Sequence, residues 1–204
     1  MTTTMDGSSL TIAAERFPDM AHAYTPQPPA SVVLAGGCFW CVEAVFRPLQ
    51  GVTAVYSGYA GGSAATAHYD AVCTGTTDHA EVVQVMFDPD VISYNDILKI
   101  FFAIAHDPTQ KDQQGNDRGR QYRSAIFFQN EQEQRAVDEY IHQLDQAAVF
   151  SKPIATTLEP LDTFYPAEDY HQDYAAHNPH QPYIQHVAKP KVEKLKKSYS
   201  DRLK

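Results

Sequence analysis

A continuous apolar run that ends in two glycines most constrains what this chain can fold into. Residues 31–35 read Ser-Val-Val-Leu-Ala, which lacks the alternation of a strand with one wet face and predicts a buried, central strand. Gly36 and Gly37 break the strand, and apolar residues then recur at helical spacing from Cys38 to Pro48. The segment therefore predicts a strand, a tight turn and a helix with Cys38 at its start.

Strand and helix patterns alternate along the rest of the chain. Strands are expected at residues 52–59, 80–87, 122–128 and 155–158, and helices at residues 94–105 and 130–148. The polar segment 106–121 is long for a simple connection, and such segments are usually functional or disordered. Because no internal repeat or second domain stands out, the pattern predicts one domain of the α/β or α+β class around a single mixed sheet.

The two ends of the chain differ from its centre in composition. Residues 1–30 are rich in Ser, Thr, Ala and Pro, which predicts a poorly structured, flexible extension before the domain of residues 31–188. Residues 189–204 contain seven basic and two acidic residues, so they carry +5 while the remaining 188 residues carry −14. Apolar residues lie on one face of this segment, which predicts a basic, amphipathic helical tail.

Composition excludes several classes of protein. The chain has 204 residues, 43% hydrophobic and 20% charged, which is typical of a globular domain and not of a disordered or fibrous chain. Its net charge of −9 argues against a general nucleic-acid binder. No apolar stretch approaches the ~20 residues of a membrane helix, and the first 30 residues lack the pattern of a secretory signal. We therefore expect a protein of the cytoplasm, a reducing compartment.

Three cysteines are too few for a disulfide scaffold, and two of them fall at the expected helix start. Unpaired backbone N–H groups at a helix N-terminus favour a thiolate, which predicts a reactive thiol at Cys38. Cys41 follows three residues later on the same helix face, a good geometry for forming and breaking a disulfide. The pattern favours redox or nucleophilic chemistry, with a buried small hydrophobic residue or a metal ligand as the alternatives.

Glu81 is the second candidate for chemistry. It shares one strand face with Val83, Val85 and Phe87, so burial could raise its pKa and make it a general acid. The alternative is a carboxylate at the strand end that points at water, and the pattern alone favours this alternative.

Zinc is the metal to consider, because the chain combines cysteines with several histidines. Cys38, Cys41, Cys73 and His79 are ligands of the right type, but their spacing matches no standard finger or ribbon. The Cys38-Phe39-Trp40-Cys41 segment also lacks the turn residues of a metal knuckle. We therefore expect neither a bound metal nor another cofactor.

Six motifs, in order and at compatible spacing between about residues 31 and 174, resemble those of peptide methionine sulfoxide reductase of the A type. They are Gly37-Cys38-Phe39-Trp40, Thr77-Asp78-His79-Ala80-Glu81-Val82, His106-Asp107-Pro108-Thr109, Gln114-Gly115-Asn116-Asp117, Gln121-Tyr122-Arg123-Ser124 and Phe164-Tyr165-Pro166-Ala167-Glu168. The resemblance implies a two-layer α/β sandwich with a ferredoxin-like core. It also implies an enzyme that reduces the S epimer of methionine sulfoxide, both in proteins and free in solution.

The resemblance assigns roles around the sulfoxide oxygen. Cys38 matches the nucleophile that attacks the sulfoxide sulfur, and Glu81 matches the acid that protonates the departing oxygen. Tyr69 and Tyr122 match the phenols that hydrogen-bond this oxygen, and Asp117 matches a carboxylate near the substrate. These roles agree with the chemistry, because a sulfoxide oxygen is a poor leaving group until it is protonated.

The resemblance also assigns an apolar pocket to Phe39 and Trp40, which would hold the methyl group on the sulfoxide sulfur. Aromatic rings bind such a group by contact and by sulfur–aromatic attraction. With these roles assigned, a buried and protonated Glu81 is favoured over a strand-end carboxylate in water.

Recycling of the enzyme is implied to depend on Cys41. Many family members carry recycling cysteines near the C-terminus, but no cysteine follows Cys73 in this chain. The resemblance to members with a second cysteine in this motif implies a Cys38–Cys41 disulfide, reduced in turn by a thioredoxin-type partner. Cys73 is expected to be a buried packing thiol, with a second resolving role as the alternative. The family resemblance also favours a monomer.

Two rival functions and one departure from the family pattern remain open at this point. The rivals are a thioredoxin-like disulfide oxidoreductase, which would not need Glu81 and the two phenols, and a non-enzymatic zinc-binding module. The departure is Asp78, which stands where the family commonly has Gly and adds a negative charge close in sequence to Glu81. That charge is expected to raise the pKa of Glu81 slightly or to alter substrate entry.

Overall fold

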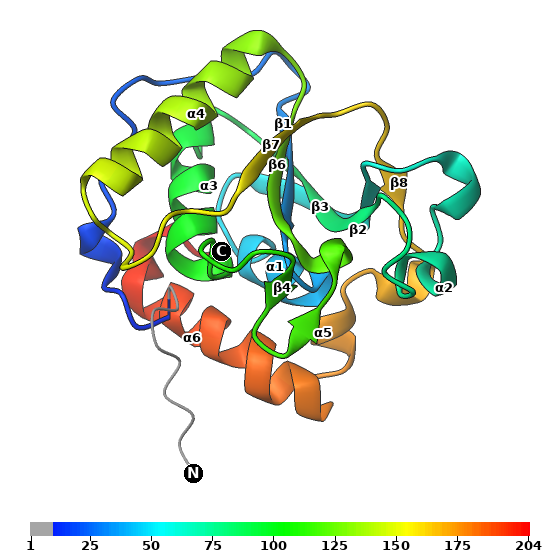
Figure 1. Ribbon diagram of the computed structural model, residues 1–204. Helices are drawn as coiled ribbons and strands as arrows, with labels where there is room; N and C mark the ends of the chain where they lie inside the picture. Colours follow the sequence, from blue (N-terminus) through cyan, green and yellow to red (C-terminus); the bar gives the residue numbers. More distant parts are fainter. Residues whose placement is uncertain (1–9) are drawn as a thin grey trace.

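A six-stranded mixed sheet forms the centre of the computed structural model, which describes residues 10–204 (Figure 1). The strands are β1 (Ser31–Gly36), β2 (Val52–Ala60), β3 (Ala80–Phe87), β6 (Ser124–Phe128), β7 (Thr157–Pro160) and β8 (Tyr165–Pro166). They lie in the order β7-β6-β1-β3-β2-β8, and the β6–β7 pair is parallel while the other neighbouring pairs are antiparallel. All six residues of β1 are buried, which confirms the prediction of a central strand.

Helices and a small hairpin complete the domain. The helices are α1 (Phe39–Phe46), α2 (Tyr69–Val72), α3 (Tyr94–Ile100), α4 (Glu131–Gln146), α5 (Tyr174–His177) and α6 (Lys189–Ser198). The π-helical segments η3 (Phe101–Ala105) and η6 (Ile184–Ala188) extend α3 and precede α6, and β4 (Gln113–Gln114) pairs with β5 (Asp117–Arg118). Short 3₁₀ turns lie at η1 (Ala14–Arg16), η2 (Ala64–Thr66), η4 (Arg120–Tyr122), η5 (Asp169–His171) and η7 (Ser200–Arg202). A single mixed α/β domain with helices around one sheet is therefore confirmed.

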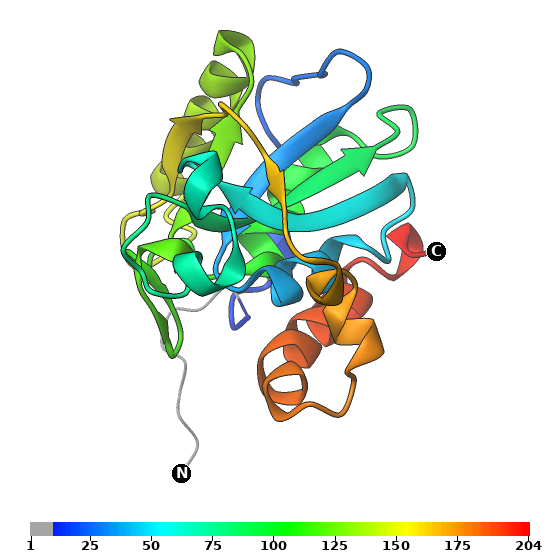
Figure 2. The same cartoon turned by 90° about the vertical axis from the view of Figure 1, so that its right-hand side faces the viewer.

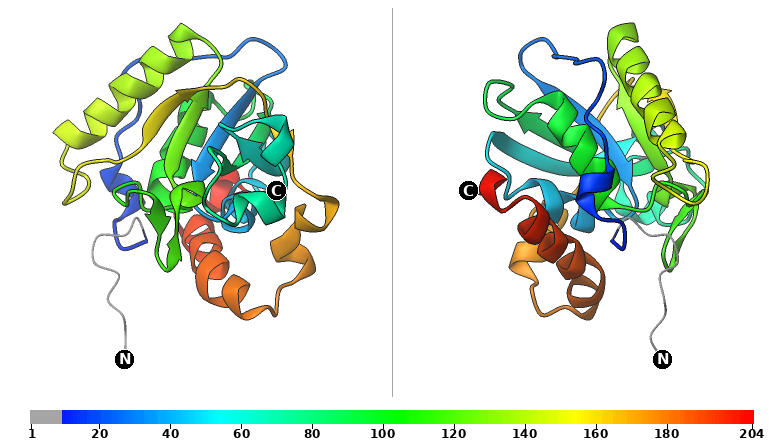
Figure 3. Two further views of the ribbon diagram at one scale, coloured as in Figure 1. Left: turned by 45° about the vertical axis from the view of Figure 1, so that its right-hand side comes forward. Right: turned by 90° about the vertical axis from the view of Figure 1, so that its left-hand side faces the viewer.

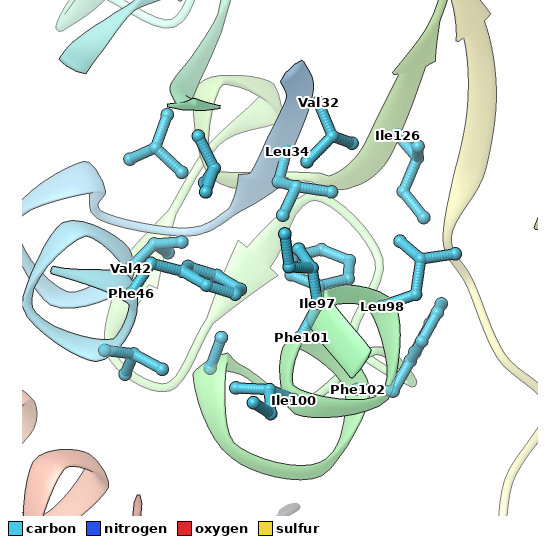
Figure 4. Packing of buried hydrophobic residues seen from close by; sticks show 14 of the residues in the cluster. Val32, Leu34, Val42, Phe46, Ile97, Leu98, Ile100, Phe101, Phe102 and Ile126 are labelled. Atoms are coloured by element: carbon cyan, nitrogen blue, oxygen red, sulfur yellow. The ribbon is translucent and has the colours of Figure 1, made fainter. Parts of the chain in front are cut away.

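The main core lies between one face of the sheet and the helices. Val32 and Leu34 of β1 point toward α1 and α3, where Val42, Ile97 and Phe101 meet them (Figure 4). Side chains alternate along a strand, so the intervening residues of β1 face the opposite side of the sheet. There they form a smaller cluster that the segment between β7 and β8 covers with Leu161 and Phe164.

The basic C-terminal segment is part of the packed domain and not a separate tail. Leu195 of α6 is fully buried in the main core, and Leu203 forms a β-bridge with Leu49 just after α1. In Figure 2 the orange and red C-terminal helices lie together beside α1 at one end of the sheet. The predicted amphipathic helix is present as α6, and its apolar face covers α1 and η3.

The N-terminal segment also packs against the domain, in contrast to the predicted flexible extension. Phe17 is 1% exposed in the main core, and the Tyr140 hydroxyl of α4 donates a hydrogen bond to the Pro18 carbonyl at 2.9 Å. Asp19 pairs with Lys99 of α3, and Figure 3 shows the dark-blue segment running beside these helices. The prediction failed because the segment is rich in Ser and Pro, and its few buried apolar residues, such as Phe17 and Met20, do not form a periodic pattern. Residues 1–9 lie outside the described part of the chain.

Two strands begin two residues later than expected. Strand β6 begins at Ser124, because Tyr122 belongs to the 3₁₀ turn η4 that precedes it. Strand β7 begins two residues later than expected, at Thr157. Within residues 10–204, no helix has both the length and the apolar character needed to cross a membrane.

Candidate active site

The turn between β1 and α1 places Cys38 at the start of the helix, as predicted. Gly37 has a φ of +86°, in the left-handed region that favours glycine. A Cβ at this position would also lie 2.5 Å from Cγ of Gln114 in β4. The missing side chain thus allows both the sharp turn into α1 and the close approach of the β4–β5 hairpin, which carries Asp117.

Glu81 lies inside the protein and touches the same helix start. It is 3% exposed, and its Oε2 accepts a hydrogen bond from the Phe39 backbone N–H at 3.0 Å. Burial, together with the negative charges of Asp117 and Cys41, raises the pKa of Glu81 to about 8 against the lowering effect of this hydrogen bond. Glu81 is therefore largely protonated at neutral pH, and the alternative of a strand-end carboxylate in water is wrong.

The two cysteines of the motif are reduced and close together. Burial raises the pKa of the half-buried Cys38 thiol, and its neighbours Cys41 and Glu81 act in the same direction. The Cys38 side chain makes no capping hydrogen bond, and the first helical N–H, that of Phe39, donates to Glu81. Burial therefore opposes the predicted thiolate at Cys38.

Cys41 is the more acidic of the two thiols. Its sulfur accepts a hydrogen bond from the Cys38 thiol, which lowers the pKa of Cys41 against the effect of burial. The Cys41 thiol in turn lies 3.9 Å from the Tyr183 hydroxyl. A thiol pair of this kind shares one proton more easily than it carries two negative charges.

Two phenols approach Cys38 and Glu81 from α2 and η4. Burial raises the pKa of both Tyr69 and Tyr122, and the charges that Glu81 and Cys38 carry once they are ionised act in the same direction. Both hydroxyls therefore keep their protons and can donate hydrogen bonds. Glu168 fixes Tyr69 in place, because its two carboxylate oxygens accept from the Tyr69 N–H at 3.0 Å and from the Tyr59 hydroxyl at 2.8 Å.

Aromatic rings surround the beginning of α1. Phe39 is almost fully buried, and the Trp40 ring stacks on Tyr174 with centroids 3.8 Å apart and an interplanar angle of 10°. The Trp40 Nε1–H donates to Nδ1 of the buried His171 at 3.0 Å, and the Phe39 ring lies 5.0 Å from the His171 ring. This aromatic cluster contains Phe39, Trp40, His171, Tyr174 and Tyr183.

Tyr183 connects several of these groups, and sequence reasoning missed it. Its hydroxyl donates a hydrogen bond to Oδ2 of Asp117, and its ring meets Trp40 edge-on at 6.1 Å. The structure therefore brings Asp117 to the Cys41 side of the site. The sequence offered one signal, the aromatic and histidine-rich stretch of residues 164–180, which stops three residues short of Tyr183.

Two other expectations about single residues need correction. Cys73, expected to be a buried packing thiol, is exposed at the C-terminal end of α2, where Val72 makes the buried contact. Asp78 forms a salt bridge of 2.9 Å with Arg120 and does not contribute to the raised pKa of Glu81, for which the nearby negative charges are Asp117 and Cys41. Its backbone φ is not positive, so the position does not require glycine.

Within residues 10–204, no three His, Cys, Asp or Glu side chains come together as a group that could hold a metal ion. His79, which the zinc hypothesis would use, instead has one ring nitrogen 3.2 Å from the Gly62 N–H and the other 2.9 Å from the Ser63 carbonyl. Cys38 and Cys41 face Glu81, Tyr183 and Asp117. These surroundings suit proton transfer to or from a thiol.

Comparisons with known proteins agree with this chemistry. The family model described as peptide methionine sulfoxide reductase matches residues 30–203, so the basic C-terminal segment lies within the family's common region. A peptide methionine sulfoxide reductase MsrA 2 of Synechocystis is 49% identical over 172 residues, which are 84% of this chain and 80% of that protein. An MsrA of Thermus thermophilus is 50% identical over 177 residues, 87% of this chain and 99% of that protein.

Solved structures give the same result at the level of the fold. The reduced form of Mxr1 from Saccharomyces cerevisiae has a TM-score of 0.68 and 33% identity, and covers 79% of this chain and 92% of its own. Methionine sulfoxide reductase A of Corynebacterium diphtheriae has a TM-score of 0.64 and 36% identity, with coverage of 77% and 80%. The chain belongs to the peptide methionine sulfoxide reductase family and is a thiol-dependent methionine sulfoxide reductase of the A type.

Proposed function

We propose that this protein reduces the S epimer of methionine sulfoxide, in proteins and free in solution, with Cys38 as the nucleophile. One observation carries the proposal: a buried carboxylic acid with a pKa of about 8 touches the helix start that carries the thiol. An acid of this kind keeps its proton at neutral pH until a reacting group takes it. Membership of the family supports the substrate class.

In the first step the Cys38 sulfur attacks the sulfoxide sulfur while Glu81 gives its proton to the sulfoxide oxygen. The hydroxyls of Tyr69 and Tyr122 stabilise the negative charge that develops on this oxygen. The protonated oxygen then passes from the methionine sulfur to the Cys38 sulfur, the bond between the two sulfurs breaks, and methionine leaves with a sulfenic acid on Cys38. The proton of the Cys38 thiol returns to the Glu81 carboxylate. The sulfoxide is thereby reduced to methionine, and the Cys38 thiol is oxidised by the same two electrons.

Phe39 and Trp40 are proposed to hold the methyl group of the substrate, because they supply apolar rings directly beside Cys38. Trp40 is fixed in this role by its hydrogen bond to His171 and by its stacking on Tyr174. Asp117 is proposed to lie near the polar part of the substrate, since it belongs to the neighbouring hairpin.

In the second step Cys41 is proposed to resolve the sulfenic acid. Its sulfur attacks the Cys38 sulfur, a Cys38–Cys41 disulfide forms, and the oxygen leaves as water with the thiol proton. A thioredoxin-type dithiol then reduces the disulfide by thiol–disulfide exchange. The support is the contact of the two thiols and the lowered pKa of Cys41, which favours the attacking thiolate. We propose that this cycle runs in the cytoplasm and in a monomer.

Separated sulfoxide epimers test the substrate assignment. We expect the wild-type protein with dithiothreitol to convert methionine-S-sulfoxide, to leave the R epimer unchanged, and to lose all turnover in Cys38→Ser. Product is measured by chromatography of the released methionine. Turnover of the R epimer, or of neither epimer, would sink the proposal.

Cys41→Ser tests the resolving role. This variant should release one equivalent of methionine per chain but fail to cycle with thioredoxin, thioredoxin reductase and NADPH. Cys73→Ser is the matched control, because Cys73 is exposed and lies outside the thiol pair, and it should cycle like the wild type. Full thioredoxin-driven cycling in Cys41→Ser would show that another thiol resolves Cys38.

A further inference from the structure

A lysine of the C-terminal helix α6 is buried and interacts with Cys41. Lys191 is only 9% exposed, although lysine side chains usually lie in solvent. It follows Ala188 by three residues on a helix, so the two side chains lie on neighbouring positions of one face. Ala188 and Ile184 pack in one cluster with Cys41, and α6 lies against α1. Packing on this side of α6, together with the electrostatic effect of Lys191 on Cys41, places Lys191 on the face that meets α1.

Lys191 forms no salt bridge with any residue of the described range 10–204. Its other titratable neighbour is His106, which is buried and whose pKa burial lowers to about 3, so that this ring is neutral. A buried ammonium group without an ion-pair partner interacts strongly with an anion that forms close to it, because the protein interior screens charge less than water does.

The groups that face Cys41 act on it in opposite directions. The Cys38 thiol, which donates a hydrogen bond, Lys191 and the Tyr183 hydroxyl favour the negatively charged sulfur. Burial and the carboxylate of Asp117 oppose the charge, and Glu81 adds no charge while it is protonated. Lys191 is the one cation among these five groups.

We propose that Lys191 is a positioning residue for the second step, in which its buried ammonium group stabilises the thiolate of Cys41 that attacks the Cys38 sulfenic acid. This inference rests on the proposed resolving role of Cys41. The step balances without a further reactant, because the Cys41 proton leaves with the sulfenic oxygen as water while the two sulfurs join. Lys191 touches neither substrate nor the oxygen, and it acts only through Cys41.

A thiolate titration tests the electrostatic part of the proposal without any turnover. In a Cys38→Ser/Cys73→Ser background Cys41 is the only thiol, and its ionisation is followed by absorbance at 240 nm. We expect Lys191→Met, which keeps the apolar stem, to raise the pKa of Cys41 by about one unit. Lys191→Arg should restore it, and Lys197→Met, an exposed lysine of the same helix, should leave it unchanged. Lys191→Gln replaces the Met variant if that variant does not fold.

Rapid-quench kinetics with wild-type cysteines test the consequence for the reaction. At pH 7, Lys191→Met should slow disulfide formation relative to methionine release by about five- to tenfold, with rescue by Lys191→Arg. An unchanged pKa of Cys41, or an unchanged ratio of the two rates, would overturn the proposal. The wild-type protein could also form no Cys38–Cys41 disulfide while the pKa of Cys41 still shifted in Lys191→Met. That result would refute the resolving role of Cys41, and the proposed role of Lys191 would be refuted with it.

Discussion

At the scale of single residues, burial of Glu81 lowers stability at alkaline pH but supplies a proton donor at neutral pH. Its pKa is about 8 in the folded protein against 4.5 for an ordinary glutamate, because burial disfavours the charged form. Between these two pH values the folded state holds a proton that the unfolded state has lost. The contribution of Glu81 to stability is therefore fully present below pH 4.5 and is lost as the pH rises through about 8.

We predict that Glu81→Gln stabilises the protein at alkaline pH. An amide has no charge to desolvate, so the free energy of unfolding at pH 9 should rise by on the order of a few kcal/mol relative to the wild type. At pH 5 the two proteins should differ little. Urea unfolding at both pH values measures the difference. An equal effect of the substitution at the two pH values would show that Glu81 is not the titrating group.

The same residue predicts the pH dependence of the chemical step. Methionine release in single turnover should fall as the pH rises through about 8, since the proton donor is then lost. Glu81→Gln should slow this step by roughly 10²- to 10⁴-fold and remove the alkaline limb. Glu133→Gln is the control, because Glu133 is also buried but accepts from Tyr94, away from the thiols. A fast Glu81→Gln enzyme would contradict the assigned acid.

Single residues also show where sequence reasoning reached its limit. The motifs led to Cys38, Cys41 and Glu81, which the structure brings together. The pattern around Cys38 could not show that the first helical amide donates to Glu81, because the two partners are 42 residues apart. For the same reason the link from Cys41 through Tyr183 to Asp117 depends on three segments that meet only in the folded protein.

At the scale of elements, the turn between β1 and α1 requires glycine at position 37. We predict that Gly37→Ala lowers the free energy of unfolding by more than about 2 kcal/mol, because strain from the positive φ adds to a clash with Gln114. Gly115→Ala is the matched control, since Gly115 also has a positive φ but no atom within 4 Å of the added methyl group. An equal loss of unfolding free energy in the two variants would show that the clash with Gln114 does not contribute.

The C-terminal helix α6 gives a second prediction at this scale. Leu195→Ala should cost about 2–5 kcal/mol of unfolding free energy, because it leaves a cavity between α6 and the core. The exposed neighbour Lys196, changed to Ala, should alter stability by less than about 0.5 kcal/mol. Chemical denaturation of both variants checks this. A mild effect of Leu195→Ala would show that α6 contributes little to the packed core.

Elements with strong periodicity were predictable, and short elements were not. The strand of residues 80–87 and the capped helices that follow Ser93 and Asn130 appear as expected, because local pattern and tertiary packing agree there. The small hairpin β4–β5 and the two-residue strand β8 carry no periodic signal, since each forms only two paired positions with its partner strand. These short pieces nevertheless hold Asp117 and the segment leading to Glu168.

At the scale of the whole molecule, the ends of the chain close the fold around the site. The N-terminal segment lies on α3 and α4, and the C-terminal helices lie on α1 (Figures 2 and 3). Composition alone predicted that both ends are separate from the domain. A few buried apolar residues hold each end in place, and they hardly change the composition of a polar segment. The C-terminal segment matters most for function, since Tyr183, directly before η6, and Lys191 of α6 both interact with Cys41.

One measurement tests the central claim most directly: a peptide map of the protein after reaction with one equivalent of methionine-S-sulfoxide and no reductant. The account predicts one equivalent of methionine per chain and a single disulfide that joins Cys38 to Cys41, with Cys73 still free. Release of methionine with a disulfide that contains Cys73, or a disulfide without release of methionine, would contradict it.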